Sequence, residues 1–145
     1  MSKPRVVGFI QARLTSTRLP NKVLAKIGSR SVLQLMLERL SRATQLDQIV
    51  FLIPDTPDND ALDVYIKSTI QAPVFRGSEH DVLTRFYDAS LVYPADFYVR
   101  MTADCPLICP EIVDRVVNAV LEDGAAYGSN VFPTTFPDGF DVECL

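Results

Sequence analysis

Short apolar runs alternate with amphipathic segments along the chain. Three runs rich in β-branched and aromatic residues have the pattern of buried strands, and they lie at 6–10, 49–53 and 97–101. Four segments place apolar residues at helical spacing, and they lie at 32–43, 62–70, 82–92 and 112–121. Weaker strands are expected at 73–75, at 125–130 and from about 140 onward. This alternation predicts a single α/β domain with helices packed on a parallel sheet.

Residues at three places are expected to begin or end the helices. Ser31 precedes the first amphipathic segment and is a suitable N-cap. Asp58, Asn59 and Asp60 can begin the second helix, where carboxylates are stabilised by the positive end of the helix dipole. We favour this capping interpretation over a metal site. The helix at 112–121 is expected to end at Gly124.

A cationic loop at 11–22 follows the first apolar run. Arg13, Arg18 and Lys22 carry its charge, and its hydroxyl groups come from Thr15, Ser16 and Thr17. Because ligands of open α/β sheets bind beyond the carboxyl ends of the strands, this loop is a candidate polyphosphate site. The alternative is a solvated loop. Neither the GxxxxGK[ST] pattern nor the GxGxxG pattern occurs, so a phosphate site here is of another kind.

Two further loops are expected at the same edge of the sheet. The loop at 76–81 offers Ser78 and Asp81 as hydrogen-bonding groups, although Ser78 or Glu79 can equally be a helix N-cap. Asp104 follows the run at 97–101 and can hold Mg²⁺, which prefers oxygen ligands and shares them with phosphates. The alternative for Asp104 is a turn before Pro106.

Composition restricts the partners. The chain of 145 residues has a net charge of -4 and a sequence pI near 4.9, which argues against nucleic acid as a partner. No apolar run approaches the length of a membrane span, and no secretory cleavage site follows the first residues, so we expect a cytoplasmic protein. Three cysteines and one histidine without a CxxC pair indicate reduced thiols rather than a zinc site.

Four ordered motifs carry a family resemblance. They begin at Gln11 (QARLTSTRLPNKVL), Phe75 (FRGS, followed by DVL), Arg100 (RMTADCPL) and Pro137 (PDGFDVE). In this order they resemble the cytidylyltransferases that activate acidic sugars, most closely the spore coat polysaccharide biosynthesis type. The resemblance implies a three-layer α/β/α nucleotidyltransferase fold of Rossmann-like kind. Residues 1–145 would be the nucleotide-binding part of such a domain, truncated at its C-terminal side, because the family continues for roughly another hundred residues.

The resemblance also implies an activity. A sugar hydroxyl would attack the α-phosphate of CTP, giving a CMP-sugar and pyrophosphate in surface polysaccharide or glycan biosynthesis. It places Arg13, Lys22 and Asp104 in catalysis, with Mg²⁺ on Asp104. The nucleotide contacts it implies are Gln11, Ala12, Arg13, Ser16, Arg18, Lys22, Arg76, Ser78 and Asp81. The base would meet backbone and amide groups of Gln11 and Ala12, and Asp138 and Asp141 are weaker candidates for the sugar.

Two alternatives stay open. The chain can be a catalytically incomplete nucleotide-binding module that needs a further segment. It can also be a glycosyltransferase using a nucleotide sugar, although the Asp-x-Asp pair of such enzymes is not visible after 97–101. Apolar surface on an incomplete sheet would favour a homodimer.

Overall fold

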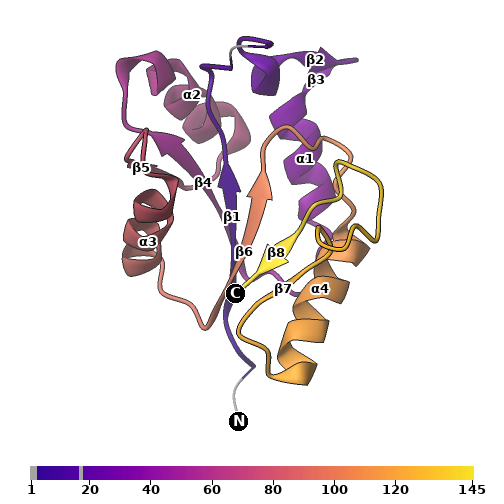
Figure 1. Cartoon of the computed structure of the whole chain (residues 1–145). Coiled ribbons are helices and arrows are strands. Elements are labelled where there is room, and N and C mark those ends of the chain that lie inside the picture. The colour runs from indigo at the N-terminus through magenta and orange to yellow at the C-terminus, as the bar shows by residue number, and fades with distance from the viewer. Residues whose placement is uncertain (1–2, 17) are drawn as a thin grey trace.

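The computed structural model describes residues 3–16 and 18–145. Its main sheet has six strands in the order β5-β4-β1-β6-β8-β7 (Figure 1). The strands are β1 (Val6–Gln11), β4 (Gln48–Pro54), β5 (Val74–Gly77), β6 (Phe97–Thr102), β7 (Gly128–Ser129) and β8 (Glu143–Cys144). The neighbouring strands β5, β4, β1 and β6 run parallel to one another, whereas β8 pairs antiparallel with β6 and with β7.

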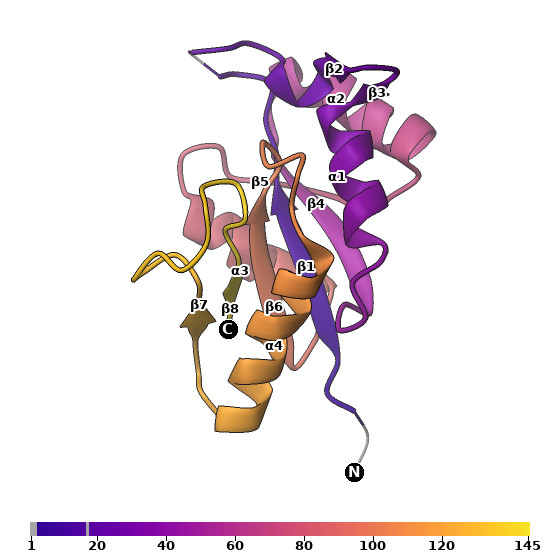
Figure 2. The same ribbon diagram turned by 90° about the vertical axis from the view of Figure 1, so that its right-hand side faces the viewer.

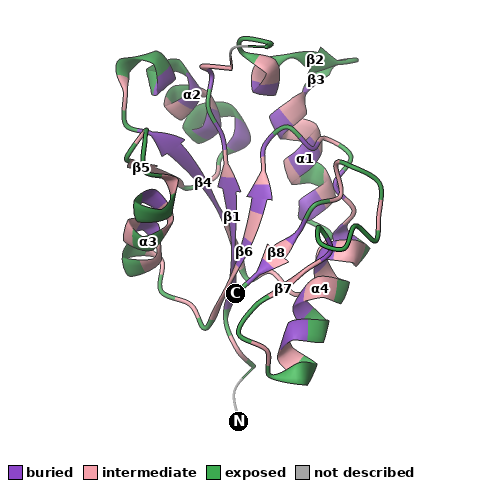
Figure 3. Cartoon of the chain, viewed as in Figure 1, coloured by how far each residue is buried: buried purple, intermediate pink, exposed green. Residues whose placement is uncertain are grey.

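Helices cover both faces of the sheet, as the side view shows (Figure 2). The helices are α1 (Val32–Leu40), α2 (Asp60–Tyr65) with a π-helical extension (Ile66–Ile70), α3 (Val82–Val92) and α4 (Pro110–Asp123). Apolar residues of α1, α2 and α4 share one core with Ile10, Phe51 and Met101. Ala89 and Phe86 of α3 pack on the opposite face. Burial is concentrated along the parallel strands (Figure 3), which confirms the predicted α/β class.

The helix ends agree with the sequence at two of the expected places. Ser31 caps α1, and its side chain and that of Gln34 form a reciprocal capping box. Helix α4 begins with Pro110 and ends at Gly124, whose left-handed φ of 62° favours glycine. At α2 the prediction of acidic residues at the helix start is correct, since Asp60 and Asp63 lie in the first turn. The prediction of a capping side chain is not, because Asn59 makes no side-chain cap.

Three expectations about segment boundaries were wrong, and one small element was not expected. Strand β5 extends through Gly77, so the loop after it begins at Ser78, and Asp81 rather than Ser78 or Glu79 caps α3. The strand expected at 125–130 is reduced to the two residues of β7, because its run of small residues leaves little to pack. A small hairpin of β2 (Lys26–Ile27) and β3 (Arg30–Ser31) was not expected, and Gly28 turns it with a φ of 64°.

The chain ends on the sheet. Leu145 exchanges backbone hydrogen bonds of 3.0 and 2.7 Å with Tyr98 of β6. Within the described residues, no helix combines the length and the apolar character needed to cross a membrane.

Candidate functional site

The register of the parallel strands brings two loops together at one edge of the sheet. Gln11, the last residue of β1, lies opposite Leu52 of β4 and Thr102 of β6. The loops that leave β1 and β6 therefore start side by side, and between them lies a hollow of about 210 Å³. Its lining consists of Gln11, Ala12, Arg13, Arg18, Lys22, Val23, Thr102, Ala103 and Asp104. The structure thus brings the predicted cations and the predicted acid together.

An ion pair joins the two loops. The Lys22 ammonium donates a hydrogen bond to Oδ2 of Asp104, and the two side chains are 29% and 41% exposed, so both stay accessible. Burial alone would raise the pKa of Asp104. Hydrogen bonds from Lys22 and from the Thr102 hydroxyl, together with the positive charge of Lys22, have the larger opposite effect, so the pKa of Asp104 lies below its ordinary value. Asp104 is therefore a carboxylate at neutral pH.

A buried asparagine, Asn59, anchors the cationic loop by a hydrogen bond to its backbone. Asn59 is fully buried, its Oδ1 accepts a 3.0 Å hydrogen bond from the Leu14 backbone N–H, and its Nδ2 donates to the Thr56 hydroxyl at 2.9 Å. The Leu14 carbonyl in turn accepts from the N–H groups of Ser16 and Asn21 at 2.9 and 3.1 Å. These bonds explain why Asn59 does not cap α2. Its role was not predicted, because the sequence shows only a polar residue at a helix start.

The end of the loop is fixed by a short 3-10 helix (Lys22–Leu24). Asn21 precedes it with a left-handed φ of 57°, a conformation that asparagine tolerates better than most residues. Val23 is buried, which anchors the turn and leaves Lys22 facing the hollow. Arg13 and Arg18 are exposed on the same loop.

Two backbone groups of Gln11 and Ala12 are hydrogen-bonded within the sheet, and a contact of these residues with a base stays a prediction. The Ala12 N–H donates to the Leu52 carbonyl at 3.0 Å, and the Gln11 carbonyl accepts from the Ala103 N–H at 2.9 Å. Both groups are used because the sheet hydrogen bonding continues one residue past β1. The side-chain amide of Gln11 also lies at the hollow, and its Oε1 is 3.5 Å from Nη2 of Arg100.

Ser16 does not line the hollow. Its Oγ accepts a long hydrogen bond of 3.5 Å from the Leu19 N–H, which closes the outer turn of the loop. Thr17, the third expected hydroxyl, lies outside the described residues.

Arg76 lies away from the hollow, in an acidic surrounding. Its guanidinium forms ion pairs with Asp55 at 2.8 Å, Asp60 at 2.7 Å and Asp63 at 3.6 Å. Hydrogen bonding to Asp60 raises the pKa of Arg76, against the opposing effect of burial. Asp60, one of the two carboxylates expected at the start of α2, thus also holds the end of β5 together with Asp55 and Asp63, and a nucleoside contact by Arg76 stays a prediction.

Ser78 and Asp81 organise the loop before α3. The two oxygens of Asp81 accept from the backbone N–H and the hydroxyl of Thr84, each at 2.8 Å, and these bonds lower the pKa of Asp81. The Ser78 hydroxyl accepts from the Asp81 N–H at 3.1 Å. Neither side chain lines the hollow, so their nucleoside contacts also stay predictions.

The donor set for a metal ion is small. In the described residues no group of three or more His, Cys, Asp or Glu side chains could hold an ion. Asp104 nevertheless fits magnesium, since this ion is commonly bound by one or two carboxylates, with water and substrate phosphates completing its shell. Cys105 lies next to Asp104, and burial raises the pKa of its thiol, so it stays protonated and is a poor ligand.

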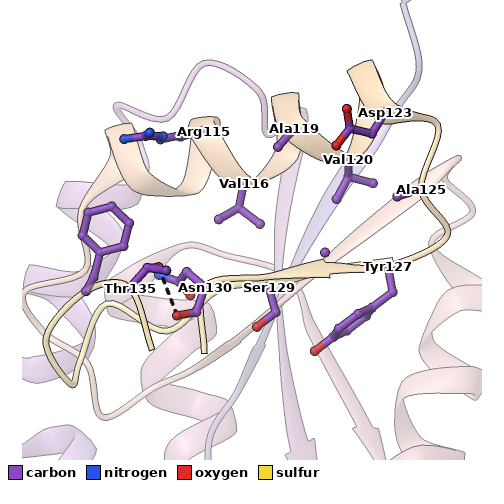
Figure 4. Close-up of a pocket in the computed structure, with 12 residues that line it drawn as sticks. Arg115, Val116, Ala119, Val120, Asp123, Ala125, Tyr127, Ser129, Asn130 and Thr135 are labelled. Carbon is purple, nitrogen blue, oxygen red and sulfur yellow. Dashed lines mark hydrogen bonds between the residues drawn. The ribbon is translucent and has the colours of Figure 1, made fainter. Parts of the chain in front are cut away.

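A larger hollow of about 500 Å³ lies between α4 and β7 (Figure 4). Val116 and Val120 of α4 form its apolar wall above Ser129 and Tyr127. Arg115 and Asp123 lie far apart along the helix, so their charges do not converge. The smaller hollow at the strand ends is therefore the better candidate site.

Known proteins resemble this chain. Residues 7–137 match the model of the family described as Cytidylyltransferase. The spore coat polysaccharide biosynthesis protein SpsF of Bacillus subtilis is 34% identical, with 84% of this chain and 52% of SpsF covered. The uncharacterized protein MJ1063 of Methanocaldococcus jannaschii is 42% identical over 86% of this chain and 51% of its own length.

Solved structures agree with these relatives. A cytidylyltransferase from Leptospira borgpetersenii has a TM-score of 0.91 and 36% identity, covering 99% of this chain and 60% of that protein. This chain spans about half the length of the curated relatives that it matches. The family model covers most of the chain, and it includes the cationic loop and Asp104. The chain therefore belongs to the cytidylyltransferase family, whose members are nucleotidyltransferases.

Proposed function

We propose that this chain forms the nucleotide-binding part of an enzyme that transfers CMP from CTP to an acidic sugar and releases pyrophosphate. The observation that carries the proposal is the hollow at the ends of β1 and β6, where Arg13, Arg18 and Lys22 meet Asp104. Membership of the cytidylyltransferase family favours nucleotidyl transfer over the glycosyltransferase alternative.

The three cations suit a chain of phosphates. An arginine presents a planar fork that can bind two phosphate oxygens, whereas a lysine is a compact point charge. Nucleotidyl transfer asks little covalent chemistry of the protein, because the acceptor hydroxyl displaces pyrophosphate directly at the α-phosphorus. The residues of the loop would orient the phosphates and neutralise the charge that develops on the leaving group.

Asp104 would hold the metal. A magnesium ion bound there would neutralise phosphate charge as a Lewis acid. In the metal-free protein Lys22 neutralises the same carboxylate. The pair thus keeps both side chains directed into the hollow before the nucleotide arrives, which reduces the ordering needed on binding.

The sugar would bind beside the nucleotide. A second hollow of about 100 Å³ adjoins the first through Thr102 and is lined by Asp141, Arg100 and Glu143 among others. Carboxylate and guanidinium groups can hydrogen-bond sugar hydroxyls and a sugar carboxylate. Asp141 lines this second hollow and Asp138 does not, so Asp141 is the better candidate for a contact with the sugar acceptor.

A second candidate is a nucleotide-binding module that is inactive alone. This candidate is favoured by the relatives, which are about twice as long as this chain, because their additional residues can complete the acceptor site. Calorimetry with CTP and Mg²⁺, together with a pyrophosphate-release assay on acidic sugars, separates the two. Binding with release supports the enzyme, binding without release supports the module, and absence of binding contradicts both.

A further inference from the structure

Helix α3 exposes an apolar stripe. Leu83, Tyr87 and Leu91 follow one another at intervals of four residues, so they lie along one side of the helix. Their exposed fractions are 80%, 62% and 64%. Among the residues of α3, all of which the structure describes, none that is exposed carries a charge. A helix that only covers a sheet turns polar residues to water, so this stripe calls for a partner.

Helix α4 shows the usual arrangement for comparison. Its core side is formed by buried residues such as Val113 and Val117, whereas Glu111, Arg115 and Glu122 are exposed on its outer side. The two helices also lie on different faces of the sheet. Apolar residues of α1, α2 and α4 share one core, and those of α3 belong to the other. The apolar outer side is therefore a feature of α3 and not of every helix in this fold.

A hollow of about 260 Å³ adjoins the α3 stripe, and Leu83 and Tyr87 form part of its wall. The rest of the wall consists of Phe9, Phe86, Ser90, Tyr98, Arg100 and Leu145. Leu145 is itself 50% exposed. Because the wall is mostly aromatic or aliphatic, it suits an apolar side chain that protrudes from a partner. None of these residues lines the hollow at the ends of β1 and β6, so this surface is separate from the candidate nucleotide site.

We propose that α3 is the interface of a homodimer, in which the α3 stripe packs against the same stripe of a second copy. Residues four apart form the ridges by which helices most commonly interlock, at a crossing angle of about −50°. A two-fold axis at Tyr87, the middle residue, brings Leu83 against the partner's Leu91 and Leu91 against the partner's Leu83. The partner's Leu91 then lies at the mouth of the hollow, since Leu83 is part of its wall. The stripe is thus complementary to itself.

The available area is sufficient for a weak dimer. A large apolar residue offers about 150 Å² when fully exposed, so the α3 stripe and Leu145 present on the order of 400 Å² per chain. Two copies would cover about 800 Å² on these residues alone, and the wall of the hollow brings the total near the ~1,000 Å² that a specific interface needs. A dimer of this size should depend on concentration. It would be the homodimer considered from the sequence, and it does not require the proposed function.

The test is sedimentation equilibrium over a range of protein concentrations. The parent should pass from monomer to dimer as the concentration rises. Leu83→Lys and Leu91→Glu each bury an unpaired charge twice in the symmetric interface, so each variant should associate at least about tenfold more weakly. Val64→Lys on α2 is the matched control, because Val64 is also 64% exposed but lies outside the stripe. It should associate as the parent does.

A mixture of the two variants tests the pairing directly. In their heterodimer the introduced lysine and glutamate face each other at one end of the crossing, while the original pair of leucines meets at the other. The mixture should therefore dimerise more strongly than either variant alone. Because both positions are exposed in the single chain, each variant should melt near the temperature of the parent.

Three results would overturn the inference. A parent that is monomeric at all concentrations would do so, and would favour further residues, such as those by which the longer relatives exceed this chain, as the cover of α3. A dimer that persists in both variants would place the interface elsewhere. A mixture that associates no better than the separate variants would contradict the pairing of Leu83 with the partner's Leu91. The binding of CTP decides the proposed function independently of all three.

Discussion

Lys22 and Asp104 lie 82 positions apart in the sequence and form an ion pair across the ends of β1 and β6. The parallel register that sets Gln11 opposite Thr102 creates this meeting, because each residue follows its own strand into a neighbouring loop. The pair brings together the last cation of the 11–22 loop and the carboxylate assigned to the metal. Several consequences of this relationship can be measured.

Removing either partner should nearly abolish turnover. Loss of one charge-stabilising group in comparable sites costs on the order of 3 kcal/mol, or about a hundredfold in rate. We therefore expect Lys22→Ala and Asp104→Asn to release pyrophosphate about a hundredfold more slowly while they keep the circular dichroism spectrum of the parent. Lys26→Ala, in the exposed hairpin, is a matched control. Rates within a few-fold of the parent would remove these residues from the mechanism.

Without metal, the Asp104→Asn variant should bind CTP more tightly than the parent, although its turnover is expected to be slower. Asp104→Asn removes a negative charge from the hollow and frees the Lys22 ammonium, so CTP should bind several-fold more tightly in the presence of a chelator. With Mg²⁺ this advantage should shrink or reverse, because the carboxylate ligand is missing. The measurement is calorimetry with and without the metal. Weaker metal-free binding by the variant would show that Asp104 does not compete with the phosphates for Lys22.

The ion pair should also contribute a pH-dependent stability. The pKa of Asp104 is lowered in the folded protein from its ordinary value of 3.8, so the stabilisation is present above that value and is lost as the pH falls through the lower folded value. Since the carboxylate is partly exposed, we expect less than about 1 kcal/mol. The difference in unfolding free energy between the parent and Asp104→Asn should be constant near neutrality, begin to fall near the ordinary value and be lost below the lower folded value. A difference that grows on acidification would contradict this account.

Asn59 should matter for both stability and binding. Asn59→Ala leaves the buried Leu14 N–H without an acceptor, which costs about 1–3 kcal/mol in comparable cases. The loop at 11–22 should then exchange its amide hydrogens faster, and CTP should bind more weakly because the cations are less ordered. Urea unfolding and hydrogen exchange measure the two effects. Asn118→Ala on the exposed side of α4 should change neither, and an Asn59→Ala protein with parent-like loop exchange would refute the supporting role.

The sequence was sufficient to predict the layered α/β architecture and that Arg13, Arg18, Lys22 and Asp104 would lie together at one edge of the sheet. Continuous apolar runs identify β1 and β4 because strands buried on both faces need apolar side chains throughout. Strand β6 is identified by its aromatic and β-branched residues, although it contains Arg100 and is only partly buried. Strand β7 was overestimated, since its small residues carry no periodic pattern and only pairing with β8 defines it.

The supporting residues could not be predicted. Asn59 supports the loop at 11–22 through its bond to Leu14, and Arg85 bonds the Ser78 carbonyl; only the folded chain brings these groups near one another. Arg76 shows the reverse case. Its sequence position suggested a ligand contact, but three aspartates from the segment at 55–63 surround it in the fold. Charge alone does not reveal which cations are already neutralised.

The central claim concerns where the phosphates and the metal bind. A crystal structure of the chain with CTP and Mg²⁺ tests it most directly. Our account predicts triphosphate oxygens within hydrogen-bonding distance of Arg13, Arg18 and Lys22, with the metal on Asp104. A nucleotide seated between α4 and β7, or a metal ion bound away from Asp104, would contradict it.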